Sequence, residues 1–459
     1  MLMALQVYYL AVSVGLFLYS LFSPRHAVRA VVLGMAFNIF PLALQPYMNM
    51  DVARLGGMPL VYLPVTAAGL ALVVHNGLHF PRSHRTLYTL IVLYLVYTFC
   101  NTMLARGMTA SNLVYWLAWP LNFIMFAAAM AITGRMEPAF LNRMLERCVQ
   151  LLVAASLVGL ARYASGIEPD ANFIPLMNRN GTVVLIALLF PLVFHVHDTQ
   201  GKSRLWLFAC AGTIALCVAL TFSRSGLVGL MAGVVLYYWR FSVMGFVKLA
   251  AATAVLALFL ASGIAERTTE RLLLTGRTVS ALVQNEEVDR SVGDRNRVLL
   301  VHGALATARE HFWFGTGLGM ENYREGLSKA SPLPLTSKAH NFYISYFAEL
   351  GVFGFALLLA ILQRIYASLA PLRTRHRAYR VSFIVMALMM TMNEYILLPE
   401  LWLIFGILAG VSRCIRTPAA TVLRPVTTRP VFMAVGPPGA AGAPLRTVPS
   451  HAPGDRHGS

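Results

Sequence analysis

The stretch FYISYFAELGVFGFALLLAIL, at residues 342–362, decides the fold of this chain. It carries a single charged residue, Glu349, and a helix of about 20 such residues is long enough to cross a hydrocarbon layer about 30 Å thick. Similar segments recur along a chain of 459 residues that is 58% hydrophobic and only 12% charged. Soluble domains are about 25% charged. The sequence therefore predicts an all-α fold, a polytopic transmembrane helical bundle.

Thirteen apolar segments account for this bundle, so we expect about 12–13 spans. They lie near Leu5–Phe22, Val28–Leu44, Met58–Val74, Leu87–Leu104, Leu113–Ile132, Cys148–Ala161, Val183–Val196, Leu205–Phe222, Leu227–Trp239, Val243–Ile264, Phe342–Leu362, Val381–Leu398 and Leu401–Cys414. Thirteen crossings would leave the two termini on opposite sides of the membrane. A re-entrant segment, or a fused pair, would reduce the number to twelve.

The net charge of +18 belongs mainly to arginines in the connectors between apolar segments. Basic residues mark alternate connectors, namely Arg82/Arg85, Arg135/Arg143/Arg147, Lys202/Arg204, Arg240/Lys248 and Arg364/Arg373/Arg375/Arg377/Arg380. The positive-inside rule places this set in the cytoplasm, and the connectors 161–180, 223–226 and 265–340 on the outside. Because the positive charge sets topology, we predict no nucleic-acid binding.

The chain divides into four parts by composition. Residues 1–264 are N-terminal transmembrane helices, residues 265–340 an outside loop, residues 341–415 C-terminal transmembrane helices, and residues 416–459 a tail. The loop includes a helical stretch, Arg297–His311, so we expect it to be ordered. The tail is rich in Pro, Gly, Ala, Thr and Arg, and is expected to be disordered on the cytoplasmic side.

Two polar motifs stand at the outer ends of predicted spans. In the S-R-S-G motif, Arg224 lies between two apolar segments, where an arginine is costly unless it faces a cavity, a partner or an anion. Its guanidinium can bind phosphate oxygens in a bidentate fork, although an arginine that snorkels to the interface is the alternative. The N-R-N-G motif offers Asn178, Arg179 and Asn180 near a helix start, which suits an anionic or sugar ligand or a simple N-cap.

The outside loop contributes two further elements. In SVGDRNR, residues 291–297, Arg295 and Arg297 can supply positive charge to a diphosphate. The glycines of GTGLG, residues 315–319, resemble a phosphate loop only superficially, because the Gly-Lys-Ser/Thr ending and a preceding strand are missing. A tight turn between two helices of the loop explains them better.

The fourth element, HNFYISYFAELG at residues 340–351, opens the span after the loop. His340 lies at the membrane surface near a helix start, where a neutral imidazole can accept a proton from an attacking hydroxyl. A structural interfacial histidine is the alternative. Asn341 and Tyr343 are further substrate-binding candidates at the same surface, although Tyr343 and Tyr346 are also typical of an aromatic belt.

Signals for metals and for other catalytic chemistries are missing from the sequence. There is no H-E-x-x-H, no G-x-S-x-G and no D-x-D, and no histidine–carboxylate cluster has metal-ligand spacing. The five cysteines form no CxxC pair and are expected to be apolar packing residues. We therefore predict no metal site and no cofactor.

Taken in order, these motifs resemble the O-antigen ligase and polymerase superfamily of lipid-linked glycan transferases. The resemblance rests on N-R-N-G before a span, S-R-S-G between spans, S-V-G-x-R before a helix and a glycine turn, and H-N-x-Y before E-L-G-V-F-G, over roughly residues 172–354. It implies a multi-pass protein of the bacterial inner membrane whose active site faces the periplasm. It also implies that Arg224 and either Arg295 or Arg297 hold the diphosphate of an undecaprenyl-linked glycan, and that His340 takes part in transfer.

In the implied reaction, an acceptor hydroxyl attacks the anomeric carbon and expels a lipid diphosphate. Arginines can stabilise the charge of this leaving group without a metal. One-step displacement inverts the anomeric configuration, so the resemblance implies a metal-independent inverting glycosyltransferase with His340 as base. Its partners would be an undecaprenyl-diphosphate-linked O-antigen donor, a lipid A–core acceptor and membrane lipids.

Several acceptors remain open within the superfamily. A ligase uses lipid A–core, an O-antigen or exopolysaccharide polymerase uses another lipid-linked repeat, and a protein O-oligosaccharyltransferase uses Ser or Thr. The moderate loop, with no additional soluble domain, favours the ligase. A membrane transporter is the alternative outside this class, but transporters often contain internal repeats, none is apparent here, and the polar motifs cluster at one membrane face.

Overall fold

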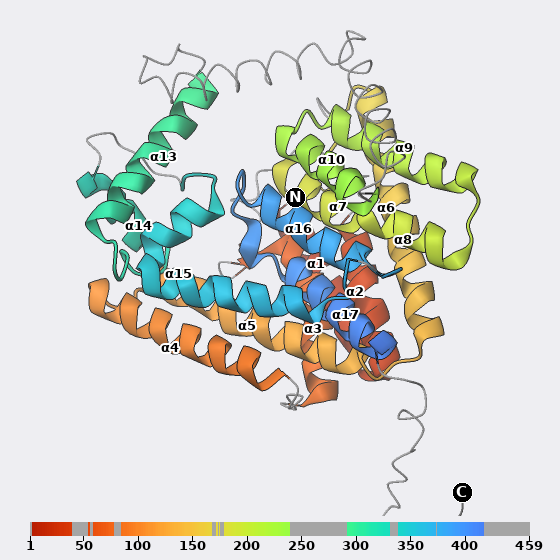
Figure 1. Ribbon diagram of the computed structural model, residues 1–459, viewed down its shortest axis with the longest axis horizontal. Helices are drawn as coiled ribbons and strands as arrows, with labels where there is room; N and C mark the ends of the chain where they lie inside the picture. The colour runs from red at the N-terminus through yellow and green to blue at the C-terminus, as the bar shows by residue number, and fades with distance from the viewer. Residues whose placement is uncertain are drawn as a thin grey trace, which may run out of the picture. The chain divides into compact units, whose positions relative to one another are not determined.

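The computed structural model describes residues 2–38, 54–55, 58–77, 84–167, 171–172, 174, 179–238, 292–330, 338–372 and 374–416. Its α-helices are α1 (Leu2–Leu21), α2 (Pro24–Phe37), α3 (Leu63–Asn76), α4 (Arg85–Arg106), α5 (Ala110–Thr133), α6 (Pro138–Ala164), α7 (Arg179–Leu189), α8 (Pro191–Gln200), α9 (Arg204–Leu220), α10 (Arg224–Tyr238), α13 (Val292–Glu310), α14 (Met320–Ala330), α15 (Phe342–Ser368), α16 (Ala378–Met389) and α17 (Pro399–Arg416) (Figure 1). Two short 3₁₀ turns, η2 (Leu60–Tyr62) and η4 (Tyr395–Leu397), and an antiparallel pair of two-residue strands, β1 (Arg54–Leu55) and β2 (Met58–Pro59), complete the described elements.

This architecture confirms the predicted polytopic helical membrane bundle. Within the described residues, five stretches are long and apolar enough to cross a membrane, and shorter apolar helices accompany them. Most predicted segments coincide with a helix. The predicted segment Val243–Ile264 lies outside the described residues, as does the predicted tail beyond Arg416.

Two predicted spans differ from the helices that form. The segment Val183–Val196 becomes α7 and α8, because Pro191 has no backbone N–H to continue the hydrogen-bond ladder; together the two helices still form one apolar stretch, Asn180–Gln200. The segment Val381–Leu398 was predicted too long. Its helix, α16, has 12 residues and measures about 18 Å, which is shorter than the hydrocarbon layer.

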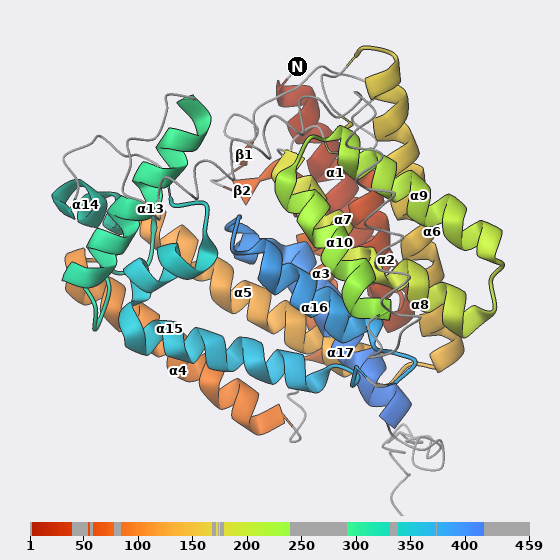
Figure 2. The ribbon, with the colours of Figure 1, turned by 45° about the horizontal axis from the view of Figure 1, so that its top comes forward.

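The described helices pack in two groups. The first contains α1–α5 together with α15 and α17, and its most extensive contact joins α5 to α17; the second contains α6–α10 and α16, in which α10 packs on α7 and α16. Figures 1 and 2 show α13 and α14 beside α15, α4 and α5, separate from the second group. The candidate site lies where the start of α15 meets the end of α16.

Residues from the predicted cytoplasmic connectors gather at one end of the bundle, which we call the basic end. There Lys202, before α9, pairs with Glu146 at 2.6 Å, and the guanidinium of Arg377 lies 4.5 Å from the centre of the Tyr237 ring. Arg25 at the start of α2 likewise pairs with a residue before α6 at 2.8 Å. The starts of α7, α10 and α15, which carry the polar motifs, lie at the other end, which we call the motif end.

The first and last described helices connect these two ends. The start of α1 lies at the motif end, because Tyr8 donates a hydrogen bond at 3.1 Å to the carbonyl of Phe37, the last residue of α2. The end of α17 lies at the basic end, where the Cys414 thiol contacts the Met136 carbonyl at 3.0 Å. Leu2 and Arg416 are therefore at opposite ends of the bundle.

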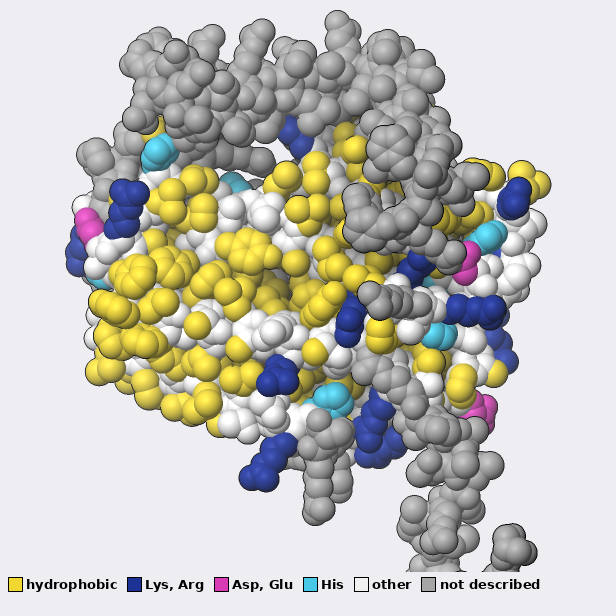
Figure 3. Space-filling model, in the orientation of Figure 1, with side chains coloured by type: hydrophobic (Ala, Val, Ile, Leu, Met, Phe, Trp, Pro, Cys, Tyr) yellow, Lys and Arg dark blue, Asp and Glu magenta, His cyan; other side chains and the backbone are white. Residues whose placement is uncertain are grey.

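The surface of the bundle matches that of a protein in lipid. Large apolar side chains are exposed along α4, among them Val92, Leu93 and Val96 at 50–58%. Figure 3 shows hydrophobic side chains across the face that carries α4 and α15, with lysines and arginines mostly around its border. An apolar surface of this extent would be unfavourable in water.

Candidate active site

The turn Lys338–Asn341 precedes α15 and holds His340 in an unusual backbone conformation. His340 has a φ of 50°, in the left-handed region that non-glycine residues rarely occupy. Its side chain is exposed, whereas Ala339 and Phe342 on either side are buried. The Asn341 side chain ends the turn by accepting a hydrogen bond at 3.1 Å from a backbone N–H in the first turn of α15. Such conformations cluster at functional sites, where the surrounding structure holds them in place.

The segment Met390–Glu394, which follows α16, binds this turn through backbone hydrogen bonds. The Phe342 N–H donates to the carbonyl of Met390 at 2.9 Å and to that of Asn393 at 3.2 Å. The Tyr343 hydroxyl donates to a carbonyl in the last turns of α16 at 2.8 Å. Tyr343, predicted to bind substrate, therefore also joins α15 to α16.

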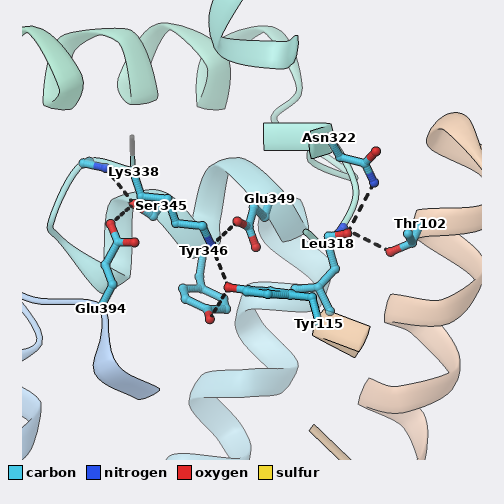
Figure 4. A network of polar contacts seen from close by, with 10 residues as sticks. Thr102, Tyr115, Leu318, Asn322, Lys338, Ser345, Tyr346, Glu349 and Glu394 are labelled. Atoms are coloured by element: carbon cyan, nitrogen blue, oxygen red, sulfur yellow. Dashed lines mark hydrogen bonds and ion pairs between the residues drawn. The ribbon is translucent and has the colours of Figure 1, made fainter. Parts of the chain in front are cut away.

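A buried network of polar side chains lies directly behind the turn (Figure 4). Lys338 forms an ion pair with Glu349, and its ammonium donates a hydrogen bond to the Tyr115 hydroxyl at 2.6 Å. The Tyr115 and Tyr346 hydroxyls share a hydrogen bond at 2.7 Å, and both rings lie 4.7 Å from the ammonium. Burial alone would lower the pKa of Lys338, but Glu349 and Glu394 raise it above its ordinary value. Lys338 therefore stays charged.

Glu394 supplies a second, partly buried carboxyl at the turn. The Ser345 hydroxyl donates a hydrogen bond to this carboxyl and accepts one from the Ala339 N–H at 3.2 Å. The carboxyl also accepts a hydrogen bond from the backbone of Asn341. Burial raises the pKa of Glu394 to about 7, although Lys338 and the hydrogen bonds act in the opposite direction.

The N-R-N-G and S-R-S-G motifs, which are far apart in the sequence, meet at the motif end of α7 and α10. The Ser223 hydroxyl donates a hydrogen bond to the Asn180 side-chain oxygen at 3.0 Å and lies 3.1 Å from the Ser225 hydroxyl. Arg224 is half-buried at the first position of α10. A Cβ at Gly226 would lie 3.0 Å from Val183 of α7, so this glycine allows the two helices to approach.

The structure describes less of the two other polar residues of the N-R-N-G motif. Arg179 begins α7, and only its backbone is described. Asn178 lies outside the described residues.

The antiparallel packing of α10 on α16 places Arg224 and His340 at the same end of the bundle. A Cβ at Gly229 would touch Met389 at the end of α16, while Tyr237 stacks with Arg377 before its start. Arg224, at the first residue of α10, therefore lies towards the segment Met390–Glu394. This segment also binds the start of α15, so the S-R-S-G motif and the His340 turn lie at the same end of the bundle.

The helices of the predicted loop pack on the His340 turn from the other side. Leu300 and Ala304 of α13, and Tyr323 and Leu327 of α14, form a small apolar core with Ala339. This confirms the helix predicted at Arg297–His311, which forms as α13. Arg295 and Arg297 are on the first turns of α13, and only their backbone is described.

The glycine run 315–319 is the tight turn between α13 and α14 that the sequence predicted. It docks against α15, where Thr316 N–H donates to the Ala348 carbonyl at 2.9 Å and Gly317 N–H to the Glu349 carbonyl at 3.0 Å. Helix α15 is kinked at this contact, because Gly351 has a φ of 62°. These glycines therefore serve helix packing in the described structure.

A separate apolar pocket lies among α2, α6 and α7. It is lined by residues that include Met35, Leu152 and Ile186, with Glu400 of α17 at its wall. None of the predicted site residues lines it.

Sequence reasoning missed the residues that hold the His340 turn. Glu349 and Glu394 were both visible as single carboxyls inside predicted apolar spans, and an ionisable residue in such a span is a functional candidate by default. Lys338, by contrast, stands in a polar loop, where a lysine carries no such signal. Its importance comes only from its burial against α15.

Comparisons with known proteins identify one part of the chain. Residues 207–359 match a family model described as O-antigen ligase. This stretch runs from α9 into α15 and includes Arg224, Arg295, Arg297 and His340. No curated protein and no solved structure matches the chain. Residues 207–359 are thus similar to an O-antigen ligase domain, which is consistent with a member of the O-antigen ligase and polymerase superfamily.

Proposed function

We propose that the protein is an O-antigen ligase that transfers an undecaprenyl-diphosphate-linked O-antigen to lipid A–core. The observation that carries this proposal is the His340 turn, in which a left-handed, exposed histidine lies between the buried Ala339 and Phe342 and the turn is bound to the segment Met390–Glu394 that follows α16. This geometry offers a base and a cationic phosphate site at one end of a membrane bundle.

In the proposed reaction, an acceptor hydroxyl of lipid A–core attacks the anomeric carbon of the donor. A new glycosidic C–O bond forms, the C–O bond to the diphosphate breaks, and the hydroxyl proton passes to the neutral imidazole of His340. The charge that develops on the diphosphate is stabilised by Arg224 and by Arg295 or Arg297, without a metal or cofactor. Asn178, Arg179, Asn180, Asn341 and Tyr343 are proposed to contact the glycan or its diphosphate. The single displacement inverts the anomeric carbon.

The motif end is proposed to face the periplasm of the inner membrane. The basic end gathers residues of predicted cytoplasmic connectors, such as Lys202 and Arg377, and basic residues favour the cytoplasmic side. The donor would then enter sideways from the outer leaflet.

A polymerase that uses a second lipid-linked repeat as acceptor is the second candidate, because the family match does not distinguish it from a ligase. Transfer to lipid A–core alone would support the ligase. Transfer to a second lipid-linked repeat alone would support the polymerase.

The test uses purified protein with undecaprenyl-diphosphate glycan and, separately, lipid A–core, a second lipid-linked repeat or a peptide. We expect transfer to lipid A–core that survives a chelator and falls at least about 100-fold in Arg224→Ala and His340→Ala, as loss of a charge-stabilising group or a base predicts. Arg204→Ala is the matched control, because this exposed arginine also begins a helix but lies at the basic end.

Each part of the proposal can fail separately. Unimpaired transfer by the Arg224 and His340 variants would refute the site assignment. Loss of transfer with chelator would refute the metal-independent mechanism, and a retained anomeric configuration would refute single displacement.

A further inference from the structure

We propose that Glu394 is a positioning residue that holds the His340 turn in its left-handed conformation, and that only its ionised form does so. The proposal rests on the proposed role of His340 as the base. Glu394 does not contact the reacting atoms; it acts through Ser345 and through the backbone of Asn341.

The backbone on both sides of His340 is linked to Glu394, in the segment Met390–Glu394 that follows α16. Ala339 N–H donates to the Ser345 hydroxyl oxygen at 3.2 Å, and that hydroxyl donates to the Glu394 carboxyl. On the other side of His340, the backbone of Asn341 donates directly to the same carboxyl. One carboxyl therefore fixes the residue before His340 and the residue after it. A left-handed conformation at a non-glycine residue persists only where its surroundings impose it.

The donors around Glu394 require an acceptor, which a carboxylate provides best. An ionised carboxyl has two acceptor oxygens, whereas a protonated one must place its own proton and accepts less well. The ionisable groups that influence Glu394 or are influenced by it are Lys338 from the turn, Glu349 from α15, Tyr323 from α14 and Tyr115 from α5. Lys338 favours the ionised form, while Glu349 and burial oppose it.

This arrangement makes glycan transfer dependent on pH. Because the pKa of Glu394 is raised to about 7, its carboxyl gains a proton as the pH falls through about 7, and the turn then loses an acceptor. His340 must also be unprotonated to act as base. Two groups therefore have to lose a proton, so log kcat should fall with a slope of about two per pH unit on the acid side.

Three variants test the role of Glu394. Glu394→Ala should lower kcat about 100-fold with little change in KM, because a misplacement of about 1 Å at a catalytic group costs this much. Glu394→Gln keeps the length of the side chain but is neutral like the protonated carboxyl, so it should hold kcat near the low value of Glu394→Ala and reduce the acid slope from about two to about one. Ser345→Ala, which removes only the link to Ala339, should fall between the wild type and Glu394→Ala.

Glu400→Gln is the matched control. Glu400 is a fully buried carboxyl in the next helix, α17, but it lines the separate apolar pocket. Its substitution should leave kcat and the acid slope unchanged, since Glu400 binds no part of the turn in the described structure.

Hydrogen exchange separates failure of this proposal from failure of the proposed function. The amides of Ala339 and Asn341 should exchange at least about 10-fold faster in Glu394→Ala than in the wild type or in Glu400→Gln, whether or not any glycan is transferred. Unchanged exchange of both amides would overturn the proposal, as would an acid slope of about two retained in Glu394→Gln. If the wild-type protein transfers no glycan but the two amides still exchange faster in Glu394→Ala, the positioning role of Glu394 is upheld and only the proposed chemistry is refuted.

Discussion

At the scale of single residues, the ion pair between Lys338 and Glu349 joins the His340 turn to α15. Glu349 is wholly buried and the Lys338 side chain is 10% exposed. A buried pair carries a desolvation cost that the attraction of its partners offsets, so that either charge alone is strongly unfavourable. The tyrosine hydroxyls around the ammonium reduce this cost without removing it.

We expect Lys338→Met or Glu349→Leu alone to destabilise the protein by about 3–5 kcal/mol, because each leaves one buried charge without its partner. The double variant should lose less unfolding free energy than the two single variants lose in sum. A double-mutant cycle of denaturant unfolding in detergent measures the difference.

The pair Lys329–Glu325 on α14, whose lysine is exposed and whose glutamate is partly buried, is the control for this cycle. Its lysine side chain is 66% exposed, so the same cycle should give a coupling free energy of about 0.5 kcal/mol or less. Additive losses at Lys338 and Glu349 would show that the buried pair contributes nothing as a pair.

At the scale of elements, the kink of α15 at Gly351 receives the turn between α13 and α14. A Cβ at Gly351 would meet the backbone of Trp313 and Phe314, and Val352 N–H donates to the Phe312 carbonyl at 2.9 Å. The E-L-G motif and the glycine run therefore form one joint, which anchors α13 and α14 next to the His340 turn.

Gly351→Ala should lower the melting temperature far more than Gly166→Ala. Both glycines have left-handed φ values, 62° and 71°, but a Cβ at Gly166 would meet nothing within 4 Å. Gly166→Ala thus reports only backbone strain, about 1–2 kcal/mol, whereas Gly351→Ala also displaces the backbone of the turn. Equal decreases in melting temperature in the two variants, measured by thermal unfolding, would show that the contact between Gly351 and the turn does not stabilise the protein.

At the scale of the whole molecule, the segregation of basic residues from polar motifs predicts the orientation of the bundle. Lys202 and Arg377 mark the basic end, and Asn180, Ser223 and His340 the motif end. If the basic end is cytoplasmic, then α14 faces the periplasm and the connector between α15 and α16 faces the cytoplasm.

Cysteine labelling tests this orientation in a background where the five native cysteines are replaced. Ser328 on α14 and Thr374 between α15 and α16 are both exposed. In a protein expressed in cells with a permeable outer membrane, Ser328→Cys should react with a membrane-impermeant maleimide. Thr374→Cys should react only after the inner membrane is opened. The reverse pattern would place the candidate site in the cytoplasm and remove the periplasmic donor from the proposal.

The sequence by itself determined the membrane bundle, most helix positions and the motif residues His340 and Arg224. Apolar span length is a local property, and the motifs are contiguous, so neither requires knowledge of distant neighbours. The helix break at Pro191 was also encoded locally, because proline lacks the N–H that a continuous helix needs.

Only the tertiary structure decided which motifs meet and what holds the candidate base. Asn180 reaches Ser223, Lys338 is buried against Glu349, and Glu394 binds the turn from the end of α16. Helix α16 stops at Met389, which turns a predicted span into the segment that positions His340. These contacts depend on side chains far apart in the chain that share a low-dielectric interior, where a charge or donor must find a partner. Composition and spacing carry no record of which partner that is.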